Sequence, residues 1–434
     1  MSFFVRTEKS SKKNQKFTSV KRKIKKQDND EELDSETEEL NGTHKSFPEI
    51  SDDEDLETPD AKRLRLAKQH LNEIRKSDDE DEDVSKKLKF EYLDSIGKLK
   101  RNIAENITGY DDQNIVTLKH KLQNHPLTCL CLAPNNDKIL FSGCKSGKVL
   151  KWDIEAKKSI GNISLDSHIM CIAIPSDFKF LVISDRSHKI YIYDPDSLKK
   201  IHTFGGHRGV VTGLAFRKDS HQMFSCSEDR TVRVWSLDEM VYVETLFGHQ
   251  NPVTSIDALY KERALTAGGN DETLRIWKIV EESQLVFNGG HLGSVDCVKF
   301  ISEETFLSCG DDGTLAVWSS SKKKPISSQK FAHGTVSTTG VANWISSIAT
   351  LVNTDLIASG SCDGHIRIWK LNNNNREIEL KFEIPVCGFV NSLQFTSDGS
   401  HIIAAIGQEH RLGRWWKLKE AKNTILVIPL KKIE

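Results

Sequence analysis

Four short stretches decide the fold: TVRVW (231–235), TLRIW (273–277), TLAVW (314–318) and HIRIW (365–369). Each alternates apolar residues with others and ends in tryptophan, as in a β-strand with one buried face. Three further stretches follow the pattern less strictly: KVLKW (148–152), KIYIY (189–193) and LGRWW (412–416). Successive terminal aromatic residues lie 41, 42, 42, 41, 51 and 47 residues apart. The sequence therefore repeats one structural unit seven times.

Three or four strands per unit at this period resemble WD repeats. The resemblance predicts an all-β fold, a seven-bladed β-propeller over residues 115–434. A ring of sheets must close on itself, because an open ring leaves an unpaired strand edge. Two segments compete for the outer strand of the last blade, IVTLKH (115–120) and TILVIPL (424–430), and the sequence leaves both open.

Polar residues keep fixed distances from the terminal aromatic residue: Asp six before it, Ser ten before it, and His 27 or 28 before it, a position that His125 also occupies. The resemblance to WD repeats implies that these side chains and the indole N–H form a hydrogen-bonded chain tying the strands together. A Ser-His-Asp nucleophile would occur once, whereas this set recurs, so we interpret it as scaffolding. The residues assigned to this structural role are His207, Ser225, Asp229, Trp235, His249, Asp271, Trp277, His291, Ser308, Asp312, Trp318, Asp363 and Trp369.

Several units depart from the repeat. Ser146 and Ser187 replace the Asp in the first two units, Tyr193 replaces a Trp, and His410 stands at the Asp position of the last. The unit between Trp318 and Trp369 is longer, and we place its extra loop near 334–344. The lone Trp344 in that loop is interpreted as a local packing residue.

The N-terminal region has a different composition. Residues 1–26 carry ten Lys or Arg and one acid, and residues 28–58 carry fourteen Asp or Glu. Such segments bury too little apolar surface to fold, so we expect a disordered basic and acidic tail over 1–57. The basic block is either a solvated tail or a nuclear or nucleolar address with salt-sensitive attraction to nucleic acid.

A helical extension is expected over residues 58–110. Thr58 and Pro59 suit a helix start, and apolar residues recur at helical spacing near 62–76 and again near 84–107. Acidic residues three positions on make Ser35, Ser51 and Ser77 candidate sites for an acidophilic kinase.

Composition excludes several classes of protein. The 434 residues hold 61 Lys and Arg and 62 Asp and Glu, and no run of 18 apolar residues suggests a membrane span. Nine cysteines with no C-x-x-C pair favour a reduced intracellular compartment. No phosphate-binding glycine loop or metal-ligand cluster is evident. We therefore expect no enzyme activity, no cofactor and no small-molecule substrate.

Basic residues concentrate in loops of units 7, 1, 2 and 3, which are adjacent once the ring closes. We predict that they form a positive arc that reads an RNA backbone. The residues assigned to it are Lys145, Lys148, Arg186, Lys189, Arg208, Arg230, His410, Arg411 and Arg414. The matching turns of units 4 to 6 carry acids instead: Glu272, Asp311, Asp312 and Asp363.

Longer strings resemble one WD-repeat family: YVETLFGHQ (242–250), KIVEESQLVF (278–287), NTDLIASGS (353–361), GQEHRLGRWWKLKEA (407–421) and KRLRLAKQHLNEIRK (62–76). This is the U3 small nucleolar RNA-interacting protein family, the WD-repeat subunit of the U3 small nucleolar ribonucleoprotein. The resemblance implies a non-catalytic nucleolar subunit. It would recognise the B/C motif of U3 small nucleolar RNA together with the kink-turn-binding box C/D core protein, among other small-subunit processome proteins, and act in pre-ribosomal RNA processing.

A second hypothesis stays open. The same ring could serve as a nuclear protein-interaction scaffold, such as a substrate receptor or a histone reader, without direct RNA binding. That hypothesis predicts a peptide-binding pocket on the central face.

Overall fold

The computed structural model describes residues 65, 88–89, 92, 99–134, 136–336, 340–372 and 376–432. The chain divides into two compact units, residues 1–76 and 77–434, and every described residue except residue 65 belongs to the second. The tail expected over 1–57 and the serines at 35, 51 and 77 lie outside the described residues. So do the helix expected near 62–76, except residue 65, and about half of the one expected near 84–107. No described helix is long and apolar enough to cross a bilayer.

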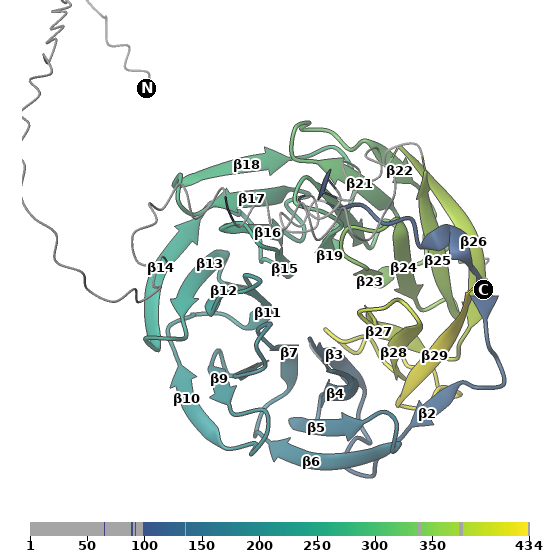
Figure 1. The fold of residues 1–434 in the computed structure, drawn as a ribbon, viewed down its shortest axis with the longest axis horizontal. Coiled ribbons are helices and arrows are strands. Elements are labelled where there is room, and N and C mark those ends of the chain that lie inside the picture. The colour runs from purple at the N-terminus through teal and green to yellow at the C-terminus, as the bar shows by residue number, and fades with distance from the viewer. Residues whose placement is uncertain are drawn as a thin grey trace, which may run out of the picture. The chain divides into compact units, whose positions relative to one another are not determined.

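Seven antiparallel sheets form a ring (Figure 1), so the prediction of a seven-bladed β-propeller is confirmed. Blade 1 consists of β3 (Leu127–Ala133), β4 (Asn136–Cys144), β5 (Lys148–Asp153) and β6 (Lys158–Ser164). Blade 2 consists of β7 (Ile169–Ala173), β8 (Leu181–Asp185), β9 (Ile190–Tyr193) and β10 (Lys200–Phe204). Blade 3 consists of β11 (Val211–Phe216), β12 (Gln222–Ser227), β13 (Thr231–Ser236) and β14 (Val241–Phe247).

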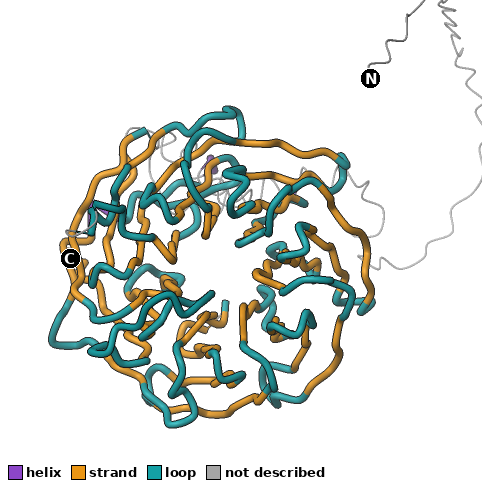
Figure 2. The backbone as a smooth tube through the Cα atoms, turned by 180° about the vertical axis from the view of Figure 1, so that it is seen from behind, coloured by secondary structure: helices purple, strands orange, loops and turns teal. Residues whose placement is uncertain are grey.

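The next three blades repeat this order. Blade 4 consists of β15 (Ser255–Ala258), β16 (Arg263–Ala267), β17 (Leu274–Lys278) and β18 (Ser283–Phe287). Blade 5 consists of β19 (Val295–Phe300), β20 (Thr305–Gly310), β21 (Leu315–Ser319) and β22 (Ser327–Gln329). Blade 6 consists of β23 (Ile345–Thr350), β24 (Leu356–Ser361), β25 (His365–Asn372) and β26 (Glu377–Pro385). The first strand of each blade lines the centre of the ring and the fourth lies at the rim (Figures 1 and 2).

Blade 7 combines both ends of the described chain. β27 (Phe389–Phe395) and β28 (His401–Gly407) are followed by β29 (Thr424–Lys432) as the third strand. The outer position is filled by β1 (Ile107–Tyr110) and β2 (Val116–Leu118), which both pair with β29. The segment at 115–120 thus closes the ring, and the segment at 424–430 takes the position next to it. The short 3-10 helix η1 (Ala104–Asn106) precedes β1.

Two sequence-based expectations are wrong here. Residues 104–110 form η1 and β1 instead of the end of a helix, because residues 107–110 supply the missing edge strand. LGRWW (412–416) lies in a loop, and Trp415 and Trp416 are 56% and 44% exposed. A third strand packed between two blades needs apolar side chains toward the core, and TILVIPL provides them. LGRWW has Gly413 where the third strands of blades 3 and 4 have Val232 and Leu274.

The core consists of seven apolar clusters, one between each pair of neighbouring blades. Trp235 of blade 3 packs with Val182 and Ile192 of blade 2, and Trp277 of blade 4 packs with Phe224 of blade 3. In blade 7, Ile428 faces the cluster shared with blade 6. Every sheet therefore gains its stability from both neighbours.

Substituting Leu118 by alanine tests how the ring closes. Leu118 lies in β2, is 2% exposed, and belongs to the cluster between blades 7 and 1. We expect Leu118→Ala to lower the free energy of unfolding by about 2–5 kcal/mol, measured by denaturant titration, because it leaves a cavity. Thr117→Ala, at an exposed neighbour, is the control. Equal stability of both variants would contradict closure by the N-terminal strand.

Candidate functional site

The polar residues at fixed offsets meet in blade 3. The His207 ring lies 2.9 Å from the Asp229 carboxylate through Nδ1 and 2.8 Å from the Ser225 hydroxyl through Nε2. The Trp235 indole N–H donates to the same hydroxyl at 2.8 Å. His207, Ser225 and Trp235 are all buried. The chain of hydrogen bonds links the loop before β11 to strands β12 and β13, and buried polar groups need such partners.

The same arrangement recurs in blades 4, 5 and 6. It joins His249, Asp271 and Trp277 in blade 4, His291, Asp312, Ser308 and Trp318 in blade 5, and Asp363 and Trp369 in blade 6. The sequence interpretation missed two members. Thr266 replaces the serine in blade 4, one position earlier than the offset rule allows. His333 completes blade 6 but lies 36 residues before Trp369, because the insertion falls between them.

Blade 1 uses a different residue from the expected one. Gln123 donates to the Ser142 hydroxyl at 2.8 Å, and Trp152 donates to it at 2.7 Å. His125 is exposed and takes no part. An amide N–H replaces the imidazole because the loop before β3 places residue 123, not 125, beside Ser142. The spacing of 27 or 28 residues before the terminal aromatic residue therefore located the partner of Ser142 only approximately.

The buried carboxylates of these chains are ionised. Burial alone would raise the pKa of Asp229, but hydrogen bonds from His207, Thr231 and the Arg208 N–H outweigh it and hold the pKa well below its usual range. The pKa values of Asp271, Asp312 and Asp363 are lowered against burial in the same way. These carboxylates link loops and strands through hydrogen bonds, and they present little free charge at the surface.

The predicted basic residues share one face of the ring. In an antiparallel sheet, successive loops alternate between faces, so loops joining second to third strands lie on the same side as loops joining one blade to the next. Lys145, Arg186, Arg230 and Arg411 lie in loops of the first kind, and Arg208 lies in one of the second kind. We call this side the b–c face. Lys148 and Lys189 lie at or beside the third-strand starts on the same side.

Three of these side chains are available to a ligand. Arg186, Lys189 and Arg208 are exposed, and none of their side chains takes part in a hydrogen bond or ion pair within the described part of the chain. Arg230 is exposed and contacts the Gln250 carbonyl at 3.5 Å. Lys148 donates to the Ser164 hydroxyl at 2.7 Å.

Lys145 and Arg414 share one buried carboxylate. Glu409, 2% exposed, lies 3.7 Å from the Lys145 ammonium and 2.8 Å from Nε of Arg414. Lys145 also donates to the Gly413 carbonyl at 3.1 Å. Lys145 therefore fixes the blade 7 loop to blade 1, whereas Arg414 forms an ion pair within that loop. The Arg414 side chain remains 71% exposed, so it still adds charge to the surface.

His168 lies beside the basic residues of the b–c face, and the sequence interpretation missed it. Its carbonyl accepts the Arg186 N–H at 2.9 Å. Burial lowers its pKa, and the charges of Arg186 and Lys145 lower it further. The lowered pKa of His168 is consistent with a position near cations of both blade 1 and blade 2. The sequence gives little indication of this role, because a single histidine in a loop matches no motif.

His410 and Arg411 are not free surface cations, which corrects their assignment to the arc. His410 is 2% exposed and stacks on Trp344 with ring centroids 4.0 Å apart. Burial, then the charges of Arg411 and Lys145, holds its pKa well below the usual range. Arg411 is half-buried and donates to the Asp296 carbonyl at 2.9 Å. The blade 7 loop turns both side chains inward over the ring's centre.

Trp344 anchors this inward turn, as a packing residue would. Its indole N–H donates to the Asp296 carboxylate, and its ring also contacts Trp415 at 4.9 Å. Burial raises the pKa of Asp296 to about 7, against the opposing charge of Arg411. The exposed Trp415 and Trp416 lie at the edge of this cluster, where stacking surfaces for bases are available.

The turns of blades 4 to 6 present less free negative charge than the sequence predicts. Asp312 and Asp363 are held by His291 and His333. Asp311 is exposed, and its pKa is raised by partial loss of solvent and then by the charge of Asp312. Glu272 is exposed. The positive charge of the arc therefore depends more on the exposed cations of blades 2 and 3 than on a contrast with acids in blades 4 to 6.

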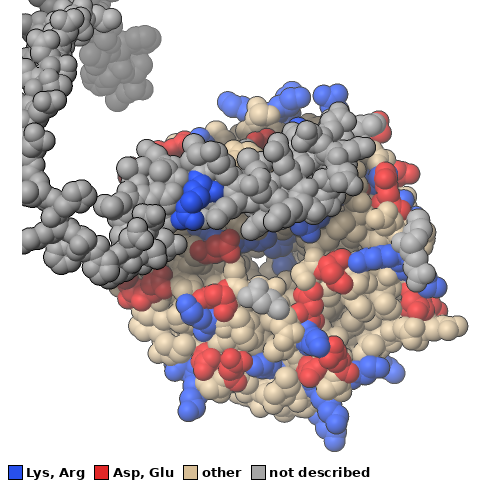
Figure 3. All heavy atoms as spheres, in the orientation of Figure 1, with Lys and Arg blue, Asp and Glu red and all other residues tan. Residues whose placement is uncertain are grey.

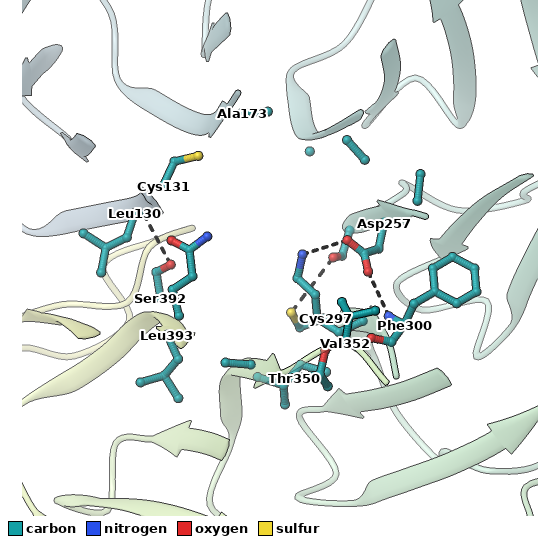
Figure 4. A pocket seen from close by; sticks show the side chains of 18 of the residues that line it. Leu130, Cys131, Ala173, Asp257, Cys297, Phe300, Thr350, Val352, Ser392 and Leu393 are labelled. Carbon is teal, nitrogen blue, oxygen red and sulfur yellow. Dashed lines mark hydrogen bonds and ion pairs between the residues drawn. The ribbon is translucent and has the colours of Figure 1, made fainter. Parts of the chain in front are cut away.

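A central channel of about 620 Å³ runs between the first strands. Asp257 accepts hydrogen bonds from the Lys299 ammonium and the Phe300 N–H, both at 2.8 Å (Figure 4). Cys297 lies beside this pair, and Ser392 and Leu393 lie across the channel. The Asp257 carboxylate is already satisfied, so it is a structural ion pair.

Ser225→Ala tests the structural role of the blade 3 chain. The change leaves His207 Nε2 and the Trp235 N–H buried without a partner. We expect the free energy of unfolding to fall by about 2–4 kcal/mol, since each orphaned group costs about 1–3 kcal/mol. Denaturant titration measures this loss, and Ser328→Ala, at an exposed site in β22, should change it little. An unaltered Ser225→Ala protein would contradict the structural assignment.

Stability should fall in acid. Because the folded pKa values of Asp229, Asp271, Asp312 and Asp363 are lowered, their contribution is present above the ordinary aspartate pKa of about 3.9 and is lost as pH falls through the folded values. We expect Asp229→Asn to flatten the dependence of unfolding free energy on pH below about 4, by up to one proton. A slope identical to that of the unsubstituted protein would count against the carboxylate's role.

Comparison with known proteins places the chain in a family. The model "WD domain, G-beta repeat" matches residues 116–153, 198–236, 240–278, 282–319 and 334–370. The human "U3 small nucleolar RNA-interacting protein 2" is 43% identical over 400 residues, covering 87% of this chain and 83% of its own. The Saccharomyces cerevisiae "Ribosomal RNA-processing protein 9" is 25% identical over 339 residues, or 69% of this chain and 58% of its own.

A solved structure agrees with these relatives. The crystal structure of "RRP9 WD40 repeats" is 46% identical, with a TM-score of 0.72, and covers 75% of this chain and 99% of its own. Identity of 43% across most of both chains exceeds what a shared propeller alone requires. The chain belongs to the U3 small nucleolar RNA-interacting protein 2 family of WD-repeat proteins.

Proposed function

We propose that this protein is a non-catalytic, RNA-binding subunit of the U3 box C/D small nucleolar ribonucleoprotein. It binds the B/C motif of U3 small nucleolar RNA beside the kink-turn-binding box C/D core protein and acts, in the nucleolus, in pre-ribosomal RNA processing and small-subunit biogenesis. Membership of a family whose human member is named for interaction with this RNA supports the proposal. The names of the yeast relative and the solved structure support the processing role.

One observation carries the RNA-binding part of the proposal. Arg186, Lys189 and Arg208 are exposed cations on one face of adjacent blades, with no ion-pair partner among the described residues. Arg230 and Arg414 extend the arc to either side. RNA phosphates attract such cations, and each contact contributes to a salt-dependent affinity. Where Figure 3 shows described residues, Lys and Arg are interspersed with Asp and Glu. A mixed surface of that kind does not favour a polyanion.

The blade 7 loop is the second feature that supports RNA binding. Trp415 and Trp416 are exposed beside Arg414, so aromatic rings and a cation occur together next to the arc. Sequence-specific RNA recognition uses single-stranded bases that stack on aromatic rings, while the backbone positions the RNA. The arc thus holds phosphates, and the loop is placed to stack an unpaired base.

The WD-repeat scaffold and the family of its relatives support the non-catalytic assignment. In the described residues, the His and Asp side chains of blades 3 to 6 saturate one another, and Asp257 in the channel is paired with Lys299. The ring therefore offers surfaces. The scaffold hypothesis without direct RNA binding differs in one measurable respect, the RNA that co-purifies with the tagged protein.

Charge reversal tests the arc. We expect Arg186→Glu with Arg208→Glu to weaken binding to a U3 B/C-motif RNA at least about tenfold and to reduce its salt dependence, because two phosphate contacts are lost. Fluorescence anisotropy at several salt concentrations measures both effects. The matched control is Lys157→Glu with Lys199→Glu, an equal charge change on exposed residues in third-to-fourth-strand turns of blades 1 and 2, on the opposite face.

The two double variants separate a specific site from general attraction. Unchanged affinity in the Arg186 and Arg208 variant would overturn the arc. Equal losses in both variants would show that net charge, not this face, controls binding. Arg411 is unsuitable for this test because its side chain is packed over the channel.

A further inference from the structure

The outer strand of blade 3, β14, differs from the other outer strands. Four of its large apolar side chains are exposed: Val241 (50%), Tyr242 (43%), Val243 (54%) and Phe247 (71%). In the described part of the chain, each other outer strand exposes at most one, such as Ile201 in β10 or Val286 in β18. β14 forms part of the rim of the ring (Figure 1). Its apolar surface thus lies on an open edge and not in a core.

The backbone of β14 is also open on one side. In the described residues, β14 is the last strand of its sheet and pairs with β13 alone. An edge strand presents unpaired N–H and C=O groups, and proteins usually protect such edges with charges, prolines or short strands. β14 has seven residues, no proline and one charged residue, Glu244, and its pairing with β13 contains one irregularity in register, between Val234 and Trp235. Such an edge can accept an added strand.

Glu244 at the centre of β14 has a carboxylate oxygen without a partner among the described residues. This Oε1 atom is buried and accepts no hydrogen bond from them. Burial raises its pKa, and the nearby Glu282 raises it further. An unsatisfied buried acceptor is costly unless a donor reaches it. The strand therefore offers a site for one Lys or Arg side chain between apolar contacts.

We propose that β14 docks an extended segment of a partner protein, which adds to blade 3 as a fifth strand. The segment carries a Lys or Arg opposite Glu244 and apolar side chains beside it. A second copy of this chain is the wrong occupant, because symmetric antiparallel pairing of residues 241–247 places Glu244 opposite Glu244, and like charges directly opposite are destabilising. The site shares no residue with the basic arc, so it does not depend on RNA binding.

A designed peptide tests the site on the full-length protein. The probe is the fluorescently labelled peptide TVTVKVTVT, whose lysine lies on one face of an extended strand and whose valines lie on the other, as Glu244 and Phe247 do in β14. We expect saturable binding by fluorescence anisotropy. Replacing its lysine by glutamate should weaken binding at least about tenfold, as should N-methylation of alternate backbone amides, which blocks strand addition.

Exchanging the charges places the peptide on β14. Glu244→Lys should lose affinity for the lysine peptide and gain affinity for the glutamate peptide. Glu379→Lys, an equal change on the outer strand of blade 6, should behave as the unsubstituted protein. If Glu244→Lys lowers the melting temperature, Glu244→Gln replaces it and should abolish the preference for lysine.

Three results would overturn the proposal. They are absence of saturable binding, equal binding of the N-methylated peptide, and a peptide preference that neither Glu244 variant alters. A dimer of the chain that Glu244→Lys abolishes would also overturn it, because the occupant would then be a second copy. Anisotropy and sedimentation velocity distinguish these outcomes.

Discussion

The packing of each sheet against both of its neighbours is the constraint on which the structure depends. Seven apolar clusters lie between blades, and none lies within a single blade. A four-stranded sheet of about 25 residues cannot offset its chain entropy unless both faces are covered. The ring must therefore be complete before any blade is stable. This requirement explains why β29 is joined by β1 and β2 from the other end of the chain.

Blades 3 to 6 could be predicted from the sequence because their local signals agree. The alternating stretch, the Asp in the preceding turn and the terminal Trp235 or Trp277 all specify one strand register. Blade 7 could not be predicted in this way. LGRWW copies the spacing of the repeat, but its tryptophans serve the loop, and the true strand follows eight residues later. The family model for the repeat likewise matches no segment in residues 154–197 or 371–434, where blade 2 and blade 7 lack the Asp and Trp.

The candidate site was predictable to the level of loops and not of side chains. Loop position follows from strand order, so the arc's placement on one face could be expected from the repeat alone. Whether a cation is free depends on contacts between residues far apart in sequence. Glu409 neutralises Lys145 across 264 positions, and Trp344 draws His410 inward across 66. No local pattern encodes such pairs, so the sequence overestimated the number of cations available to a ligand.

The pairing of Tyr110 with Leu430 has a consequence for synthesis of the chain. β1 and β2 leave the ribosome first, and their partner β29 leaves last, more than 300 residues later. At translation rates of about 5–20 residues per second, the closing strands wait roughly 15–60 s for that partner. During this interval the edge of every emerged sheet is exposed to other nascent chains. The synthesis of β29, rather than local folding of any one repeat, thus sets the time at which a protease-resistant ring first exists.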